Sequence, residues 1–370
     1  MLGKVIVNKL NLMQGGFNEV ERYLLYVGRG NGTGEEQLIT LSNATDLDVV
    51  LGPGSFDLKT QITYARQNAG QDWSAAVLAM PEGMNWKDAV DFSMEQTNVE
   101  GIAITDPLTK VADVEDMQTK AEDIMGKYMR PLFMASRARK MESSETFSEY
   151  QAAVALLTKN VVADQVTLTP SIWGYELGAY MGRLCKADVS VADTPMRVKS
   201  GSLVGNWTER PKDSTGREID ISVLEALDSA RLSVPQWYPG YDGTYFGDGN
   251  VLDAEGGDYQ VIENLRVINK CMRRVYPLAV ARIGDRSLNQ TPASLAAAAS
   301  YFLRPLREMS KGFTLMGQYF PGDIMPPEDG DITFTWATRN ELIIGMAARP
   351  YNCPKKITVN LALDLTNYGD

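Results

Sequence analysis

Histidine is absent from this chain of 370 residues. Without an imidazole, the chain can build no Ser-His-Asp or Cys-His triad, no HExxH zinc motif and no histidine general base. Catalysis by carboxylate, lysine or tyrosine groups stays open. The absence therefore excludes many hydrolase and metalloenzyme mechanisms, and we expect no catalytic, cofactor-binding or metal-binding residues.

Cysteine and long apolar runs are also scarce. The 3 cysteines, Cys185, Cys271 and Cys353, are far apart and form no CxxC pair, which predicts neither a disulfide framework nor a zinc site. A reducing cytoplasm is the compartment that this usage favours. The first 16 residues, MLGKVIVNKLNLMQGG, are too polar for a signal peptide. No run approaches the roughly 18 apolar residues of a membrane span, so we expect no membrane insertion.

Positive charge is in the minority, with 36 Lys and Arg against 47 Asp and Glu and a net charge of -11. Proteins that bind nucleic acid usually carry a basic face, so we expect no direct nucleic-acid contact. The acidic balance suits solubility, or a partner with a local basic patch. The hydrophobic fraction of 44% is ample for a core, and the length allows two or three domains.

Strand-like and helix-like segments alternate through the first half of the chain. Strands are predicted at 21–30, 73–81, 99–107, 131–138 and 161–170. Helices are predicted at 58–68, 85–96, 114–128, 145–159 and 175–187, with Asn85 and either Ser143 or Ser144 as N-caps. This alternation predicts an α/β fold with a mainly parallel sheet covered by helices on both faces.

The second half has a different pattern. Helices are predicted at 221–232, at 258–275 and from 291 to about 310, the last bent at Pro305. The aromatic segment 234–252 reads as a glycine-rich loop whose rings anchor a core or an interface. Strands at 331–338 and 341–350 predict a hairpin turning at Arg339-Asn340. We divide the chain into an arm (1–20), an α/β domain (21–200), an α+β domain (201–350) and a second arm (351–370).

One glycine-rich loop, GRGNGTGEE at 28–36, resembles a phosphate cradle. It fits neither GxxxxGK[ST] nor GxGxxG, and Glu35 and Glu36 lie where phosphate needs donors. A simple turn is the favoured interpretation. The alternative, an α/β enzyme that binds a nucleotide or sugar phosphate at Gly28–Gly34, stays open.

Acidic residues gather around a second glycine-rich loop and could bind calcium. They are Asp248, Asp253, Glu255 and Asp258. The spacing misses the Asp-x-Asp-x-Asp-Gly pattern, and Asp258 is better explained as a helix N-cap. We therefore favour a structural role for this cluster.

Two sets of basic residues recur at helical spacing. The first basic stripe is Arg266, Lys270 and Arg273. The second basic stripe is Arg304, Arg307 and Lys311. On an acidic protein, a basic helix face suggests an acidic partner. A solvated face whose aliphatic stems cover apolar neighbours is the commoner explanation.

Both ends of the chain look like strands without a partner. GKVIVNKLNL (3–12) and KITVNLALDL (356–365) are rich in apolar residues, and in the second these alternate with small or polar ones, the period of a half-buried strand. Exposed apolar edges invite aggregation unless they pair with another chain. The candidate pairing residues are Val5, Ile6, Val7, Leu10, Leu12, Ile357, Val359, Leu361, Leu363 and Leu365.

Several segments together, in this order, resemble the tail sheath proteins of contractile bacteriophages in a short form. They are YLLYVGRGNGTGEEQLITLSNATDLDVVLG (23–52), TYARQNAGQDWSAAVLAM (63–80), YELGAYMGRLCKADVSVADTPMRVKSGSLVG (175–205), TYFGDGNVLDAEGGDYQVIENLRVINKCMRRV (244–275), LAAAASYFLRPLREMSKG (295–312) and KKITVNLALDL (355–365). Two details depart from the family: Met196 replaces the usual Ala, and Gly247–Leu252 stands where Arg-Thr-Leu is usual.

The resemblance implies a structural protein rather than an enzyme. It implies terminal β-arms exchanged between subunits, a helical homopolymer around a tail tube protein, and contacts with baseplate and tail terminator proteins. It implies a place in the virion tail after assembly in the bacterial host cytoplasm. Under this resemblance the second basic stripe is the candidate for facing the tube. A tail tube or capsid-type protein fits less well, because those are mostly β.

Overall fold

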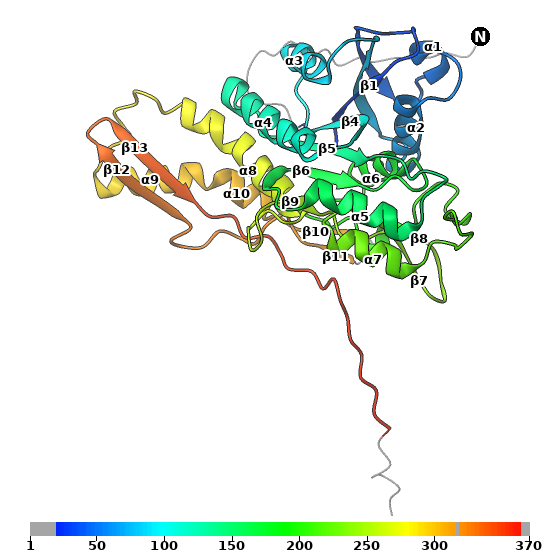
Figure 1. Ribbon diagram of the computed structural model, residues 1–370. Helices are drawn as coiled ribbons and strands as arrows, with labels where there is room; N and C mark the ends of the chain where they lie inside the picture. Colours follow the sequence, from blue (N-terminus) through cyan, green and yellow to red (C-terminus); the bar gives the residue numbers. More distant parts are fainter. Residues whose placement is uncertain (1–19, 316–317, 364–370) are drawn as a thin grey trace, which may run out of the picture.

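The computed structural model describes residues 20–315 and 318–363, which build a seven-stranded sheet between two layers of helices (Figure 1). The strands of this sheet are β1 (Leu24–Arg29), β2 (Leu38–Ser42), β3 (Ser74–Met80), β4 (Gly101–Leu108), β5 (Phe133–Ala138), β6 (Ala163–Thr169) and β9 (Val251–Leu252). Their order is β2-β3-β1-β4-β5-β6-β9. β2 and β9, at the two edges, run antiparallel to their neighbours, and the five central strands are parallel. The predicted α/β class is confirmed.

Each central strand buries both of its faces. In β1, Leu25 and Val27 belong to one hydrophobic cluster, and Leu24 and Tyr26 to the other. The first cluster is covered by α3 (Trp86–Gln96), α4 (Val111–Tyr128), α5 (Phe147–Thr158) and α7 (Ile221–Ser229). The second is covered by α1 (Leu47–Leu51), α2 (Asp57–Ala69), α6 (Glu176–Leu184) and α8 (Ile262–Val280). Burial on both faces explains why these strands read as continuous apolar runs.

Two helices begin at residues other than the predicted caps. α3 starts after Asn85 as expected, but α5 is capped by Thr146 and not by Ser143 or Ser144. Thr146 and Glu149 form a reciprocal capping box, which the two serines cannot form with that carboxylate. α8 begins after Val261 rather than at Asp258, because residues 250–251 bond to 260–261 and keep that stretch extended.

The aromatic segment 234–252 is strand rather than loop. β7 (Pro235–Tyr238) and β8 (Tyr241–Phe246) form a hairpin, and β9 follows in the main sheet. Phe246 is fully buried and stacks on Tyr180 of α6, whereas Tyr241 is 57% exposed. Aromatic and β-branched residues favour the pleated backbone, so the loop interpretation underrated the strand propensity of this stretch.

The C-terminal part packs around α8. α9 (Pro292–Phe302) and α10 (Arg304–Met309) are one predicted helix broken at Leu303, two residues before Pro305. Two small hairpins follow: β10 (Phe313–Leu315) with β11 (Gln318–Phe320), and β12 (Ile332–Thr338) with β13 (Glu341–Met346). The second hairpin turns at Arg339-Asn340, as predicted. One short 3-10 helix, η1 (Val198–Ser200), lies in the connection after α6.

Side chains between residues 219 and 252 belong to the two clusters around the main sheet. The division of the chain at residue 200 stays a prediction. Residues on the far side of that boundary pack against the same sheet as residues before it. Within the described residues, no helix is both long and apolar enough to span a membrane.

Candidate assembly site: the C-terminal segment, the hairpin and the basic stripes

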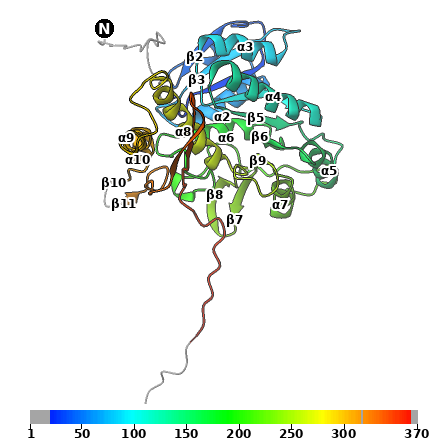
Figure 2. The same ribbon diagram turned by 90° about the vertical axis from the view of Figure 1, so that its left-hand side faces the viewer.

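Residues 351–363 form neither helix nor strand, and beyond Lys355 the chain leads away from the body (Figures 1 and 2). Their apolar side chains are open to solvent: Ile357 is 74% exposed, Val359 72%, Leu361 94% and Leu363 84%. Apolar side chains this exposed gain free energy wherever they become covered. Leu365 and the five N-terminal candidates, Val5 to Leu12, lie outside the described residues, so their pairing role stays a prediction.

Lys355 fixes the root of this segment to the body. Its Nζ donates to both carboxylate oxygens of Asp248 at 2.7 Å and lies 2.8 Å from Oε1 of Glu263. Burial opposes the charge of Lys355, but the two carboxylates outweigh it and raise its pKa. Burial, with the nearby Asp248, raises the pKa of Glu263 even though Lys355 lowers it. The part of the chain that leads away from the body therefore begins after Lys355.

The β12–β13 hairpin has two faces of different character. Ile332, Phe334 and Trp336 of β12 and Leu342, Ile344 and Met346 of β13 are half-buried. The opposite face is exposed and carries small or polar residues besides Ile343. In the described part of the chain, β12 and β13 pair only with each other. Each therefore presents one outer edge of unpaired backbone groups.

An apolar cleft of about 320 Å³ lies beside β13. We call it the methionine cleft. The described residues that line it are Met125, Met129, Pro131, Ile268, Cys271, Met272, Val275, Tyr276, Leu306, Ile344, Met346 and Ala348. They come from the end of α4 and the short stretch that follows it, from α8 and α10, and from β13. The last, Ala348, lies two residues beyond the end of β13. None of these side chains is charged.

Arg266 and Arg273 of the first basic stripe are buried and Lys270 is half-buried, which neither interpretation of the sequence expected. Arg266 is 1% exposed, and its Nε and Nη2 donate to the carboxylate of Glu100 at 2.7 and 3.0 Å. Glu100 also accepts from the backbone N–H of Arg22. Burial opposes the charge on Glu100, but Arg266, with Arg273 and the Arg22 N–H, outweighs it and lowers the pKa of the carboxyl. The pair joins α8 to the start of β4.

The other two members of this stripe are also paired inside the molecule. Lys270 Nζ donates to Asp323 at 2.8 Å. Arg273 donates to the carbonyl of Pro131 at 2.9 Å and to Glu21 at 3.1 Å. Both the acidic-partner and the solvated-face interpretations of this stripe are wrong, because this side of α8 faces the body. The signal that could have revealed it is the lone carboxylate Glu100 in the apolar run VEGIAIT.

The second basic stripe is exposed. Arg304 and its ion-pair partner Glu308 are 69% and 49% exposed and lie 3.4 Å apart on α10. Arg307 is exposed and its Nη1 lies 3.5 Å from the carbonyl of Ser300. Lys311 is exposed and lies two residues beyond the end of α10, so helical spacing does not continue to it. The tube-facing role of the three stays a prediction.

The glycine-rich loop after β1 is held by its own acidic residue. Glu35 Oε1 accepts from the backbone N–H of Gly32 at 2.7 Å. Gly32 and Gly34 have positive φ, which a tight turn here requires. A carboxylate therefore occupies the donor that a phosphate would need, and the turn interpretation accounts for the loop.

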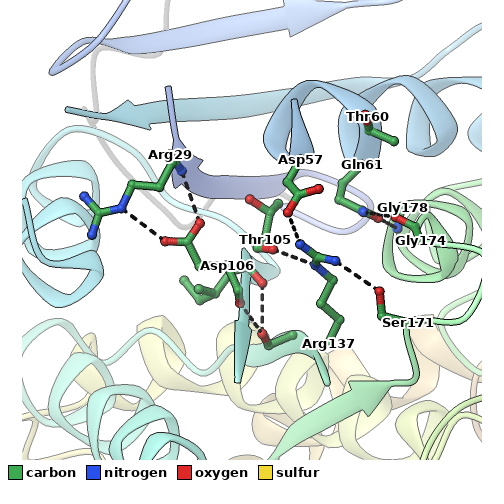
Figure 3. A network of polar contacts seen from close by, with 12 residues as sticks. Arg29, Asp57, Thr60, Gln61, Thr105, Asp106, Arg137, Ser171, Gly174 and Gly178 are labelled. Carbon is green, nitrogen blue, oxygen red and sulfur yellow. Dashed lines mark hydrogen bonds and ion pairs between the residues drawn. The ribbon is translucent and has the colours of Figure 1, made fainter. Parts of the chain in front are cut away.

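The crevice at the carboxyl ends of β1 and β4, where open α/β sheets bind ligands, is filled by side chains (Figure 3). Arg137 donates to the carbonyl of Thr105 at 2.8 Å and to Oγ of Ser171 at 3.1 Å, and it pairs with Asp57 at the start of α2. A Cβ on Gly28 would lie 1.8 Å from Oγ1 of Thr105. Polar contacts within the chain itself therefore cross this edge of the sheet.

The acidic cluster is used within the fold. Asp248 binds Lys355, and Asp253 accepts from the backbone N–H groups of Ala254 and Tyr259 at 2.7 and 2.8 Å. Among the described residues, no group of three or more His, Cys, Asp or Glu is placed to hold a metal ion.

Comparison with known proteins adds both a family and a fold. The model for "DUF2586, N-terminal domain" matches residues 2–250, and "DUF2586, C-terminal domain" matches residues 258–366. A protein of Haemophilus phage HP1 (strain HP1c1) named "Putative tail sheath protein" is 40% identical over 377 residues, which cover 100% of both chains. The sheath of PVC, an extracellular contractile injection system, in its contracted state aligns with a TM-score of 0.62 at 13% identity, over 99% of this chain and 98% of that one.

Two further solved structures share the fold. The contracted helical sheath of the anti-feeding prophage aligns with a TM-score of 0.61 at 11% identity, over 98% of this chain and 99% of that one. A sheath tail protein of Listeria innocua aligns with a TM-score of 0.57 at 8% identity, over 90% and 93%.

The full-length relative and this shared fold define the class: the chain is a contractile tail sheath protein, with a structural role. It belongs to the DUF2586 family. The same findings favour the sheath interpretation over the phosphate-binding enzyme.

Proposed function

We propose that this sheath subunit polymerises by exchanging its terminal segments with neighbouring subunits, and that the polymer surrounds a tail tube. The observation that carries the proposal is the pair of complementary features on one chain. One is an exposed segment with alternating apolar residues, 357–363, and the other is a hairpin whose two outer edges are open in the described residues. A strand added to such an edge gains main-chain hydrogen bonds and buries its apolar face.

The hairpin needs added strands as much as the segments need an acceptor. An isolated two-stranded sheet is marginally stable in water, and three or more strands with a hydrophobic face are usually required. Two strands brought by neighbours would make the hairpin the centre of a four-stranded sheet. Because the donor and the acceptor are different surfaces, the contact is heterologous and repeats into a helical filament instead of closing.

The free energies of burial and association favour many weak contacts between subunits over a single strong contact. Burying Ile357, Val359, Leu361 and Leu363 contributes about 1.5–3 kcal/mol each, or about 6–12 kcal/mol in all. Association costs an estimated 4–15 kcal/mol, so one segment alone binds a neighbour weakly. Stable assembly then requires each subunit to donate a segment to more than one neighbour and to accept segments in return. A polymer linked in this way is a mesh of subunits.

Contraction follows from the same arrangement. The body of the subunit moves as a unit in an extended polymer, and neighbouring bodies rotate and slide into a shorter, wider packing. The exchanged strands persist through this change because their main-chain hydrogen bonds are directional. The energy is stored as a difference between two packings of one polymer, and no nucleotide is needed.

The remaining partners follow from this role. The second basic stripe, Arg304, Arg307 and Lys311, faces acidic residues of the tail tube protein through polar contacts that break on contraction. The ends of the polymer contact baseplate and tail terminator proteins. Assembly takes place in the cytoplasm of the bacterial host, before the virion is released.

Deletion of Lys356–Asp370 tests the exchange. We expect a folded monomer that forms no sheath-like cylinders by electron microscopy, because the described residues of the segment, 356–363, make no part of the core. The double variant Leu361→Asp with Leu363→Asp should reproduce the loss, since it places charges where apolar contact is needed. The matched control, Thr358→Ala with Asn360→Ala, changes the polar side of the segment and should assemble. Cylinders formed by the deleted chain would refute the exchange.

A further inference from the structure

The C-terminal segment 351–363 is held to the body by a single charged side chain. Among the described residues, the Lys355 ammonium makes all the hydrogen bonds and ion pairs between this segment and the rest of the chain. Its two acceptors come from different elements, Asp248 before β9 and Glu263 in the first turn of α8. Residues 351–355 also line a cleft of about 910 Å³, together with residues of the connection after α6 and of β11. Without the ammonium, only these cleft contacts hold the segment.

The three side chains form a charged cluster that is largely shielded from water. Their exposed fractions are 29% for Lys355, 20% for Asp248 and 8% for Glu263. Oε1 of Glu263 lies 2.8 Å from the ammonium, whereas its buried Oε2 has no partner among the described residues. Two carboxylates this close disfavour each other's charge unless a cation lies beside them. The cluster therefore depends on Lys355.

The other titratable groups near this cluster do not replace the ammonium. Asp228 of α7 lies near Asp248 and adds negative charge, and its carboxylate accepts from Nδ2 of Asn250 at 2.8 Å. Burial raises the pKa of the Tyr180 hydroxyl and of the Cys353 thiol, so both stay neutral, and Asp193 pairs with Arg197 at 3.4 Å. Among the described residues, the cluster therefore sets one cation against three carboxylates.

Acid weakens the attachment through Glu263. Burial, with the neighbouring Asp248, raises the pKa of Glu263 above the ordinary 4.5 even though Lys355 lowers it. When the segment is released, Lys355 no longer lowers this pKa, so the released state binds the proton more tightly than the attached state. The contribution of Glu263 is therefore fully present above its pKa in the released state, and it is lost as pH falls through the raised pKa of the attached state.

A fixed root shortens the flexible tether of the segment. The nearest anchored residue before Lys355 is Arg349, whose carbonyl accepts from the backbone N–H of Met325 at 2.7 Å and whose guanidinium pairs with Asp331. Ile357 is two residues from Lys355 but eight residues from Arg349. Because effective concentration falls roughly as the −3/2 power of tether length, release of Lys355 lowers it roughly eightfold.

We propose that Lys355 is a positioning residue for assembly: it fixes the point from which the terminal segment leaves the body, through an attachment that weakens in acid. The inference rests on the proposed strand exchange and names the residue that prepares the donor segment before a neighbour receives it. Preorganisation of this kind raises affinity by lowering the cost of ordering, without adding a contact between subunits.

The critical concentration for polymers of the full-length chain, measured by pelleting, tests the positioning. Lys355→Met should raise it roughly eightfold, because the tether then starts at Arg349. Lys355→Arg keeps the charge, and the matched control Lys356→Met removes a charge one residue further along; both should stay within about twofold of the native chain. An unchanged critical concentration for Lys355→Met, or an equal rise for either of the other two variants, would overturn the inference.

A nitroxide on the native Cys353 gives a second readout, because this thiol is exposed and those of Cys185 and Cys271 are buried. In the unassembled chain, the ratio of mobile to restricted signal should rise about tenfold between about pH 7.5 and about pH 5, since one hydrogen bond to a charged group is lost. In Lys355→Met the ratio should be high at both pH values, and in Glu263→Gln it should not change with pH. A flat profile in the native chain, the same rise in Glu263→Gln, or a rise that coincides with loss of the native tryptophan fluorescence contradicts the attachment.

The outcomes separate this inference from the exchange on which it rests. If the chain lacking Lys356–Asp370 forms no polymer while Lys355→Met polymerises like the native chain, the exchange stands and the positioning role is wrong. If the chain lacking Lys356–Asp370 polymerises normally, the exchange and the positioning role are both refuted, and the nitroxide profile still decides whether Lys355 holds the segment.

Discussion

The two basic stripes have nearly the same spacing and opposite environments. Arg266, at the start of the first, is 1% exposed, and Arg304, at the start of the second, is 69% exposed. The first stripe ties α8 to the sheet and to residue 323, whereas the contacts of the second are long and stay within α9 and α10. The spacing of charges along a helix predicts that they share a face. It does not predict what that face meets.

The difference assigns the two stripes to different tasks. A buried, bidentate arginine–carboxylate pair fixes geometry, and breaking it leaves an uncompensated charge. An exposed stripe contributes little to folding and remains available for a partner, under control of ionic strength. Substitutions in the first stripe should therefore change stability, and substitutions in the second should change assembly.

Arg266→Met should have the largest effect on stability. It removes the partner of the buried Glu100 carboxylate, and we expect a loss of about 3–5 kcal/mol in the free energy of unfolding, measured by urea denaturation with tryptophan fluorescence. The pKa of Glu100 is lowered in the folded protein, so the pair stabilises above the ordinary carboxyl value of 4.5 and this contribution is lost as pH falls through the lowered pKa.

The matched control is Arg304→Met, the same change on an exposed helix, which should cost less than about 0.5 kcal/mol. Adding Glu100→Gln to Arg266→Met should recover part of the loss, because the unpaired charge is then removed. A loss below about 1 kcal/mol for Arg266→Met would contradict the buried pair.

Lys270→Met should have an intermediate effect. Lys270 and Asp323 are each 15% exposed, so their ion pair is partly screened by water. We expect a loss of about 1.5–3 kcal/mol, the usual contribution of a hydrogen bond to a charged group. A double-mutant cycle with Asp323→Asn measures the coupling between the two side chains. A coupling near zero would show that this contact does not hold α8 to the loop before β12.

Charge reversal of the second stripe should have the smallest effect on stability. For Arg304→Glu, Arg307→Glu and Lys311→Glu together, we expect each change to stay within about 0.5 kcal/mol. Assembly on the tail tube should fail while polymers without a tube still form, as judged by electron microscopy. The control reverses Lys140, Lys159 and Lys199, which are exposed elsewhere and give the same change of net charge. Normal assembly of the first triple variant would refute the tube-facing role.

Much of the fold was predictable because periodicity reports local conformation and burial. The five parallel strands, the hairpin at Arg339-Asn340 and the break near Pro305 were all expected from sequence. The cap of α5 was not predictable from local pattern alone, because several hydroxyl residues lie before the helix. Thr146 is the one placed to form a capping box with Glu149. The pairing of Arg266 with Glu100 was missed because 166 residues separate them and no local pattern links them.

The candidate site was predictable in its pattern but not in its surroundings. The alternation at 357–363 is visible in the sequence, and the exposure of these side chains agrees with a segment that lacks a partner among residues 20–315 and 318–363. The methionine cleft was not predictable, because its lining comes from four separate elements. Lys355 was not singled out either, since a lysine next to a second lysine is ordinarily solvated.

The attachment of Lys355 has a mechanical consequence. Under the proposed strand exchange, a neighbour that pulls on the segment beginning at Lys356 transmits tension to Asp248 before β9 and to Glu263 in the first turn of α8. One turn further along α8, Arg266 passes it to Glu100 at the start of β4, in the middle of the sheet. Under this exchange, force applied to the terminal segment is spread over α8 and the central sheet.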